Sequence, residues 1–314
     1  MDKEQIYNSP LVYQRADPFV HLHTDGYYYF TGTIPQYDSI EIRRAKTLNA
    51  LLTADSFIVW KKHTTGEMSG LIWAPELHYI DGVWYIYFTA SSDADRWSIR
   101  PYVLRCRDEN PITGKWEELG RIDVGHESFS LDMTSFIHKD GKQYTLWAQV
   151  MYPGGPSELF MARMKNPWTL ETKPMLLTTP QYPWEMHRFE VNEGPAVLQR
   201  NGKVIVTYSA SDTGCHYCMG MLWADEDSDL LNPISWRKSD VPVFMTSEKS
   251  GQYGPGHNCF TTDGDKDVIV YHSRNYRETE GDPLDDNNRH ARAKVLTYDE
   301  NGLPVFGEPV PNNI

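Results

Sequence analysis

A chain of 314 residues with 40% hydrophobic and 23% charged residues has the composition of a globular protein. Its net charge of −13, from 43 acidic and 30 basic residues, disfavours nucleic acid and anionic membrane surfaces as partners. No stretch approaches the roughly 18 consecutive apolar residues that a membrane-spanning helix needs.

The first residues, MDKEQIYNSPLVYQ, contain no basic segment followed by an apolar one, so we expect no secretory signal and a cytoplasmic location. Four cysteines are too few for a disulfide framework. The 13% of aromatic residues, with 22 glycines and 20 prolines, favours strands joined by tight turns. Aromatic rings also form walls for sugars, and composition alone does not separate the two roles.

Five segments share one plan, in which an apolar run leads through an Asp-Gly or Asn-Gly turn into a strand. They are ADPFVHLHTDGYYYFTGT from Ala16, WAPELHYIDGVWYIYFTAS from Trp73, DMTSFIHKDGKQYTLWAQV from Asp132, EGPAVLQRNGKVIVTYSAS from Glu193 and GHNCFTTDGDKDVIVYHS from Gly256. Such turns between apolar runs predict β-hairpins, because a type I′ turn needs positive φ at both central residues.

The register of the repeats is regular. Four residues each precede their turn residue by 8 positions: Asp17, Trp73, Asp132 and Glu193. Behind the hairpins follow a further strand and an outer strand, marked in three units by Trp116, Trp168 and Trp236.

Five units of about 60 residues predict an all-β, five-bladed β-propeller with about four antiparallel strands per blade. A β-sandwich or jelly roll is the alternative, but it does not explain five equal repeats. Without a linker or a break in composition, residues 1–314 are expected to form a single domain, whose last segment, AKVLTYDENGLPVFGEPVP, completes the final blade.

In a propeller the first strand of each blade lines the central channel, so Asp17, Trp73, Asp132 and Glu193 are expected to meet in one pocket. A single acid at a strand start is usually a turn or capping residue. Three acids in one register indicate a functional site instead, because buried carboxylates are costly unless they are paired.

Two carboxylates on opposite sides of a sugar suit glycoside hydrolysis, in which one protonates the leaving oxygen and the other activates water. A third carboxylate raises the pKa of the acid and so keeps it protonated.

At these positions the chain resembles glycoside hydrolase family 43, over essentially its whole length. RADPFV (15–20), SLDMTSF (130–136) and NEGPAVL (192–198) are similar to the family's segments for the base, the pKa-modulating acid and the general acid. The resemblance therefore implies Asp17, Asp132 and Glu193 in these roles, and IWAPELHYIDG (72–82) implies Trp73 as an apolar wall of the sugar pocket.

The resemblance implies three further features. GHN (256–258) is similar to a segment whose histidine lies in the channel, often beside calcium, which implies His257 and a structural calcium ion without an organic cofactor. NRHAR (288–292) resembles a segment that places an arginine beside the base, and Arg289 matches better than Arg292.

DTGCHYCMGML (212–222) and HSRNYRETEGDPLDDNNRHAR (272–292) resemble the branch of exo-acting α-L-arabinofuranosidases. The resemblance implies an inverting enzyme that releases terminal arabinofuranosyl residues from arabinan or arabino-oligosaccharides. A β-xylosidase or an endo-arabinanase of the same family, and a non-catalytic sugar-binding propeller, remain as alternatives, and the oligomeric state is left open.

Other motifs have simpler explanations. Cys215 and Cys218 have metal-ligand spacing but lack a second pair of ligands, which favours semi-buried thiols. Gly-Pro-Gly (254–256) is followed by no lysine-bearing helix and is no phosphate loop. The acidic segment from Asp282 to Asp286 is expected at the surface or at the rim of the pocket.

Overall fold

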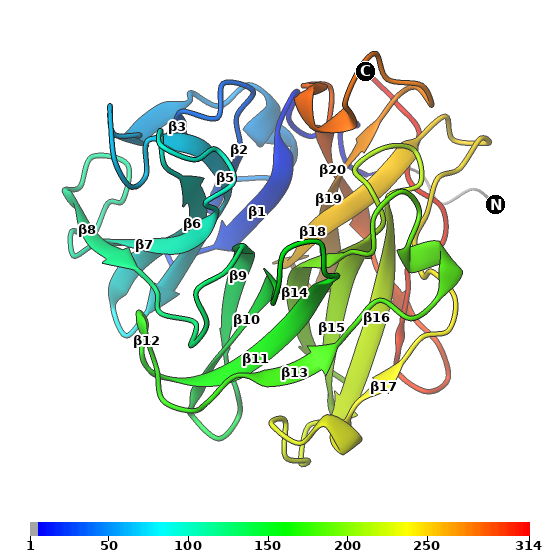
Figure 1. The fold of residues 1–314 in the computed structure, drawn as a ribbon. Helices are drawn as coiled ribbons and strands as arrows, with labels where there is room; N and C mark the ends of the chain where they lie inside the picture. Colours follow the sequence, from blue (N-terminus) through cyan, green and yellow to red (C-terminus); the bar gives the residue numbers. More distant parts are fainter. Residues whose placement is uncertain (1–5) are drawn as a thin grey trace.

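The computed structural model describes residues 6–314, and its sheets surround a central channel as the blades of a propeller (Figure 1). Within each blade the strands are antiparallel and follow chain order, except that β13 of the third blade pairs with β11. This confirms the predicted all-β, five-bladed propeller.

The strands of the five blades, separated by semicolons, are β1 (Ala16–Leu22), β2 (Tyr28–Thr33), β3 (Ser39–Ala45) and β4 (Phe57–Lys61); β5 (Gly70–Ile80), β6 (Val83–Ser91), β7 (Arg100–Cys106) and β8 (Trp116–Arg121); β9 (Ser130–Ile137), β10 (Gln143–Val150), β11 (Ser157–Asn166), β12 (Thr169–Leu170) and β13 (Met175–Thr178); β14 (Asn192–Arg200), β15 (Lys203–Ala210), β16 (Cys218–Asp225) and β17 (Arg237–Lys238); β18 (Tyr253–Asp263), β19 (Lys266–Arg274) and β20 (His290–Val295). Short 3₁₀ helices occur in the connections: η1 (Asn49–Leu52), η2 (Pro183–Glu185), η3 (Pro233–Ser235) and η4 (Pro283–Asp285).

The hydrophobic core is divided among the contacts between blades. Each first strand packs against the first strands of both neighbouring blades, and β1 packs against β18 to close the ring. Buried side chains of successive blades then form separate clusters, such as Tyr29 and Ile42 with Ile72 and Leu77 between the first two blades. Packing between neighbouring blades therefore holds the first strands in place.

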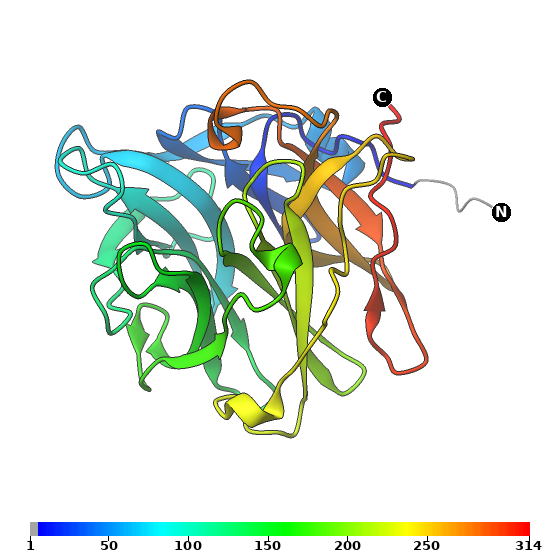
Figure 2. The same ribbon diagram turned by 45° about the vertical axis from the view of Figure 1, so that its right-hand side comes forward.

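The ring closes differently from the expectation. Residues 293–295 of the last segment belong to β20 and so form part of the last blade, but the remainder forms its own small sheet, β21 (Thr297–Tyr298) with β22 (Pro304–Val305), instead of a fourth strand. The free edge of β20 is covered by the N-terminal segment, in which Val12 pairs with Ala291 and the Leu11 N–H donates to the Ala291 carbonyl at 2.7 Å. Segments near both ends of the chain thus meet at the last blade (Figure 2).

Within residues 6–314 no helix is long and apolar enough to cross a membrane. The single-domain organisation expected for residues 1–314 stays a prediction, and residues 1–5 lie outside the described part.

Arg292 stabilises the last blade at the point where the N-terminal and C-terminal segments meet and the ring closes. Its fully buried guanidinium donates to Ser9 Oγ, to Asn312 Oδ1 at 2.7 Å and to Ser273 Oγ at 2.7 Å. These partners come from both ends of the chain and from β19. Because a buried cation needs all of its partners, the group is costly to disturb.

We predict that Arg292→Gln lowers the free energy of unfolding by about 2–4 kcal/mol, because buried hydroxyl and amide groups lose their donor. Urea denaturation followed by tryptophan fluorescence measures the change. Arg237→Gln, at an exposed arginine, is the control and should stay close to wild type. Equal stabilities of the two variants would contradict a closing role for Arg292.

Candidate active site

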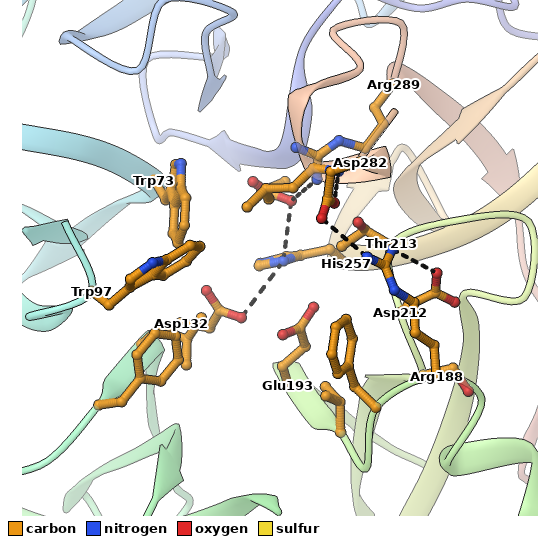
Figure 3. A pocket seen from close by; sticks show the side chains of 17 residues that line it. Trp73, Trp97, Asp132, Arg188, Glu193, Asp212, Thr213, His257, Asp282 and Arg289 are labelled. Carbon is orange, nitrogen blue, oxygen red and sulfur yellow. Dashed lines mark hydrogen bonds and ion pairs between the residues drawn. The ribbon is translucent and has the colours of Figure 1, made fainter. Parts of the chain in front are cut away.

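A cavity of about 370 Å³ opens where the first strands begin, and all five blades contribute to it (Figure 3). The six residues that the sequence singled out all line this cavity: Asp17 on β1, Trp73 on β5, Asp132 on β9, Glu193 on β14, His257 on β18 and Arg289 just before β20.

One backbone irregularity recurs in every blade and positions this lining. The first strand of each blade carries a β-bulge at an equivalent residue of positive φ: Asp17, Ala74, Asp132, Gly194 and His257, with φ of 50°, 44°, 56°, 53° and 40°. Strands β5 and β18 have a second residue of positive φ near their starts, Leu71 and Gly254. Each of the five equivalent residues lies six residues before the last residue paired across its hairpin, namely His23, Ile80, His138, Arg200 and Asp263. Bulges re-aim side chains, and here they direct them into the channel.

The bulge corrects the register read from the sequence. Trp73 and Glu193 are not equivalent to the two aspartates, because they precede the bulge and pair directly with Thr89 and Ser209. The reason is loop length, since the first and third hairpins close with three residues and the second and fourth with two. Counting from the Asp-Gly or Asn-Gly turn therefore misaligns the blades by one position.

The bulge amides join neighbouring blades. Four of these N–H groups each donate to a different side chain, which lies on the second strand of the preceding blade. Ala74 N–H donates to Thr33 Oγ1 at 2.7 Å, Asp132 N–H to Thr89 Oγ1 at 3.2 Å, His257 N–H to Ser209 Oγ at 2.7 Å and Asp17 N–H to His272 Nδ1 at 3.0 Å. In the third blade the matching residue is Ala148, which offers no acceptor. The Gly194 N–H donates instead to Asp132 Oδ2 at 3.0 Å, and this bond orients the Asp132 carboxylate.

Asp17 is held in its ionised form. Thr33 Oγ1 donates to its Oδ2 at 2.6 Å, while His257 Nδ1 lies 3.2 Å and an Arg289 nitrogen 3.7 Å from its Oδ1. Burial raises the pKa of Asp17, but the charges of His257 and Arg289 and the Thr33 hydrogen bond outweigh burial and lower the pKa to about 2.

His272 adds no positive charge to this group, although its Nδ1 lies 3.5 Å from Asp17 Oδ1. That nitrogen accepts the Asp17 N–H and so carries no proton. Burial, and next the charge of Arg289, lower the pKa of His272 well below its ordinary value. We therefore attribute the ionised state of Asp17 to His257 and Arg289.

Glu193, in contrast to Asp17, has a raised pKa that favours its protonated form. Burial and then the negative charge of Asp132 raise the pKa of Glu193 to about 7, against the hydrogen bond that Tyr217 donates to its Oε1 at 2.8 Å. Burial also raises the pKa of Asp132 to about 6, with His257 opposing and Asp17 adding to the rise. One cavity thus holds an ionised carboxylate and a protonated one.

Arg289, and not Arg292, is the arginine of the cavity. It donates to Tyr37 Oη at 3.2 Å, and the Tyr37 ring packs edge-on against Trp73 with ring centroids 5.9 Å apart. The indole nitrogen of Trp73 is buried without a hydrogen-bond partner in the described chain. Arg289 and Trp73 are therefore both fixed through Tyr37.

His257 lies between the carboxylates, with Nδ1 3.2 Å from Asp17 Oδ1 and 3.8 Å from Asp132 Oδ2. Although burial lowers its pKa, these two charges raise the pKa of His257 above the ordinary value, which favours its protonated, positively charged form. Among residues 6–314, no group of three His, Cys, Asp or Glu side chains is arranged to hold a metal. His257 alone is no calcium site, so the calcium ion stays a prediction and no step below involves it.

The rim contains residues that the sequence analysis did not assign to the site. Arg188 forms ion pairs with Asp282 at 3.2 Å and with Asp212 at 3.8 Å across the cavity wall (Figure 3). Trp97 and Phe189 also line the cavity and are about half exposed. These residues lie in long connections, where no repeat predicts their position. The expectation of a rim position for the acidic segment is confirmed for Asp282.

A propeller pocket that opposes an ionised carboxylate to a protonated one is typical of an inverting glycoside hydrolase. The comparison with protein families agrees: the model described as glycosyl hydrolases family 43 matches residues 7–304, and the chain belongs to this family.

Several relatives have similar sequences. An extracellular exo-α-(1→5)-L-arabinofuranosidase of Streptomyces avermitilis is 50% identical over 98% of the chain, and one of Streptomyces chartreusis is 51% identical over 88% of it. The matched region covers 64% of the first relative and 85% of the second. A crystal structure of an α-L-arabinofuranosidase from Lactobacillus brevis has 50% identity and a TM-score of 0.94 over 98% of both chains. The cytoplasmic location expected for this chain stays a prediction.

The raised pKa of Glu193 predicts a dependence of stability on pH. Its pKa is about 7 in the folded protein against an ordinary value of 4.5. The contribution of Glu193 to the free energy of unfolding is therefore fully present below pH 4.5 and is lost as pH rises through 7. Glu193→Gln removes this loss, and the variant should exceed wild type by roughly 1–3 kcal/mol at pH 8.

Urea denaturation at pH 4.5 and pH 8 tests this prediction. The variant and wild type should differ little at the lower pH. Glu190→Gln, which changes an exposed carboxylate, should show no difference at either pH. A Glu193→Gln protein that gains nothing at pH 8 would contradict a protonated Glu193.

Proposed function

We propose that this chain is an inverting, exo-acting α-L-arabinofuranosidase that releases terminal arabinofuranosyl residues from arabinan or arabino-oligosaccharides. The observation that carries the proposal is that one cavity places Asp17 beside His257 and Arg289 and also contains Glu193, surroundings that lower the pKa of Asp17 to about 2 and raise that of Glu193 to about 7. The names of the relatives that are about 50% identical support the sugar. Because the chain spans only 64% of the Streptomyces avermitilis relative, its own activity needs direct measurement.

In the proposed mechanism the terminal sugar packs against Trp73. Asp17, kept ionised by His257 and Arg289, takes a proton from a water that attacks the anomeric carbon. Glu193 gives its proton to the departing oxygen, and the configuration inverts. The transition state carries positive charge on the sugar, which the carboxylates of the cavity stabilise.

Asp132 has two tasks in this mechanism. Its charge raises the pKa of Glu193, and its Oδ2 accepts the Gly194 N–H next to the acid. The φ of 53° at Gly194 favours glycine, and a Cβ there would lie 3.0 Å from the His257 ring. The backbone thus keeps Asp132, Glu193 and His257 close together.

The shape of the cavity supports exo action. Its volume of about 370 Å³ is near the lower end of the roughly 300–1,000 Å³ found for small-molecule sites. Arg188 and Asp282 form part of its wall. A short pocket of this kind favours a chain end over the middle of a polymer.

Paired assays test the proposal. Hydrolysis of 4-nitrophenyl α-L-arabinofuranoside should far exceed hydrolysis of 4-nitrophenyl β-D-xylopyranoside, and linear arabinan should release arabinose from the first minutes. A preference for the xyloside would indicate a β-xylosidase, and an early ladder of oligosaccharides an endo-arabinanase. Binding of arabino-oligosaccharides without hydrolysis would indicate the non-catalytic propeller.

The assignment of the acid and the base predicts two different losses. Glu193→Ala should lower kcat/KM for arabino-oligosaccharides by about 10²–10⁴-fold, but less for a 4-nitrophenyl glycoside, whose leaving group needs little protonation. Asp17→Ala should abolish turnover of both substrates. Equal losses in Glu193→Ala, or a nearly normal rate in Asp17→Ala, would refute the respective role.

The charge of Asp132 predicts a shift in the pH profile. Because that charge raises the pKa of Glu193, Asp132→Asn should lower it and move the basic limb of kcat/KM to lower pH. Asp140→Asn removes an exposed charge near the hairpin turn of the same blade and is the matched control. An unmoved basic limb in Asp132→Asn would show that Asp132 does not tune the acid.

A further inference from the structure

Tyr217 is the one side chain, among those described, whose hydroxyl donates to Glu193, but the mechanism above gives it no role. It lies in the loop before β16, is only 1% exposed, and donates from its hydroxyl to Glu193 Oε1 at 2.8 Å. The same residue is the tyrosine between Cys215 and Cys218, a motif for which the sequence offered no function.

The last blade makes room for this ring. A Cβ on Gly256 would lie 2.4 Å from Tyr217 Cε1, and a Cβ on Gly254 would lie 2.3 Å from the carbonyl oxygen of Gly214 in the loop that carries Tyr217. The two glycines of Gly-Pro-Gly therefore allow the loop to enter between the fourth and fifth blades. Their position is explained by Tyr217 and not by a ligand.

The Tyr217 ring also stacks on His272. The two rings are stacked, with centroids 5.6 Å apart and planes 7° from parallel. His272 in turn accepts the Asp17 N–H at 3.0 Å. Tyr217 thus stands in a rigid row that leads from the segment of the base to the carboxyl group of the acid.

The direction of the hydrogen bond has a chemical consequence. Burial, and then the nearby charge of Glu193, raise the pKa of Tyr217 well above its ordinary value, so its hydroxyl keeps its proton. A carboxylic acid that accepts a hydrogen bond on Oε1 carries its own proton on Oε2. After that proton leaves, the same bond becomes charge-assisted and stronger.

We propose that Tyr217 is a positioning residue for the general acid: it holds Oε1 of Glu193, leaves the proton on Oε2 for the departing oxygen, and stabilises the carboxylate that forms. This inference rests on the proposed function. It extends that function by naming the group that orients the acid.

The variant Tyr217→Phe keeps the stacked ring and removes only the hydroxyl. We expect kcat/KM for arabino-oligosaccharides to fall about 10–100-fold, in line with the loss of a hydrogen bond to a charged group, and kcat/KM for 4-nitrophenyl α-L-arabinofuranoside to change less than about threefold. A merely structural loss would lower both equally.

The matched control is Tyr208→Phe. Tyr208 is also buried in the fourth blade and donates to a carboxylate at 2.8 Å, but that carboxylate is Glu185, outside the cavity. The ratio of the two activities should stay as in wild type in this control.

A measurement without substrate separates this inference from the proposed function. The infrared C=O band of protonated Glu193, assigned by its absence in Glu193→Gln, should move to higher frequency in Tyr217→Phe because the hydrogen bond on Oε1 is lost. If wild type hydrolyses no arabinofuranoside, the proposed function fails while this band still tests the contact. An unmoved band, or equal losses on both substrates, would overturn the role of Tyr217.

Discussion

The structure of the site depends on one backbone constraint, the β-bulge with positive φ at an equivalent position in the first strand of every blade. At each bulge the first strand directs side chains and amide groups into the cavity at the end of the channel. Each bulge amide must be satisfied, and four of the five find their acceptor on the preceding blade. The exception is the Gly194 amide, for which Ala148 supplies no acceptor, and this N–H group donates to Asp132 instead. The hydrogen bonding between blades thus also orients Asp132, which tunes the general acid in the proposed mechanism.

The charges around this backbone give two similar carboxyl groups, those of Asp17 and Glu193, different pKa values. Asp17 is buried and Glu193 is partly buried in the cavity wall, and desolvation alone would raise the pKa of both. His257 and Arg289 lie beside Asp17 and lower its pKa, whereas the largest charge effect on Glu193 is that of Asp132, which raises its pKa. The same desolvation therefore accompanies a base and an acid within one cavity. Tyr217 and Thr33 each hold one of these two groups in orientation.

Much of this arrangement was predictable from the chain alone. Equal repeats predicted the blades, and the three acids at their starts predicted the cavity, because a propeller brings equivalent positions together. The exact register was not predictable, since it depends on whether a hairpin closes with two or three residues, as at Asp81 and Asp25. Tyr217 and Arg188 were missed for a different reason: they lie in connections whose path is set by contacts between blades and not by a local pattern.

The central claim is that Asp17 and Glu193 hold opposite protonation states in one cavity at the same pH. Neutron diffraction from deuterium-exchanged crystals near pH 6 tests it most directly, because it locates protons on individual oxygens. The account predicts deuterium on Glu193 Oε2 and none on either oxygen of Asp17. Deuterium on Asp17, or a bare carboxylate at Glu193, would contradict it.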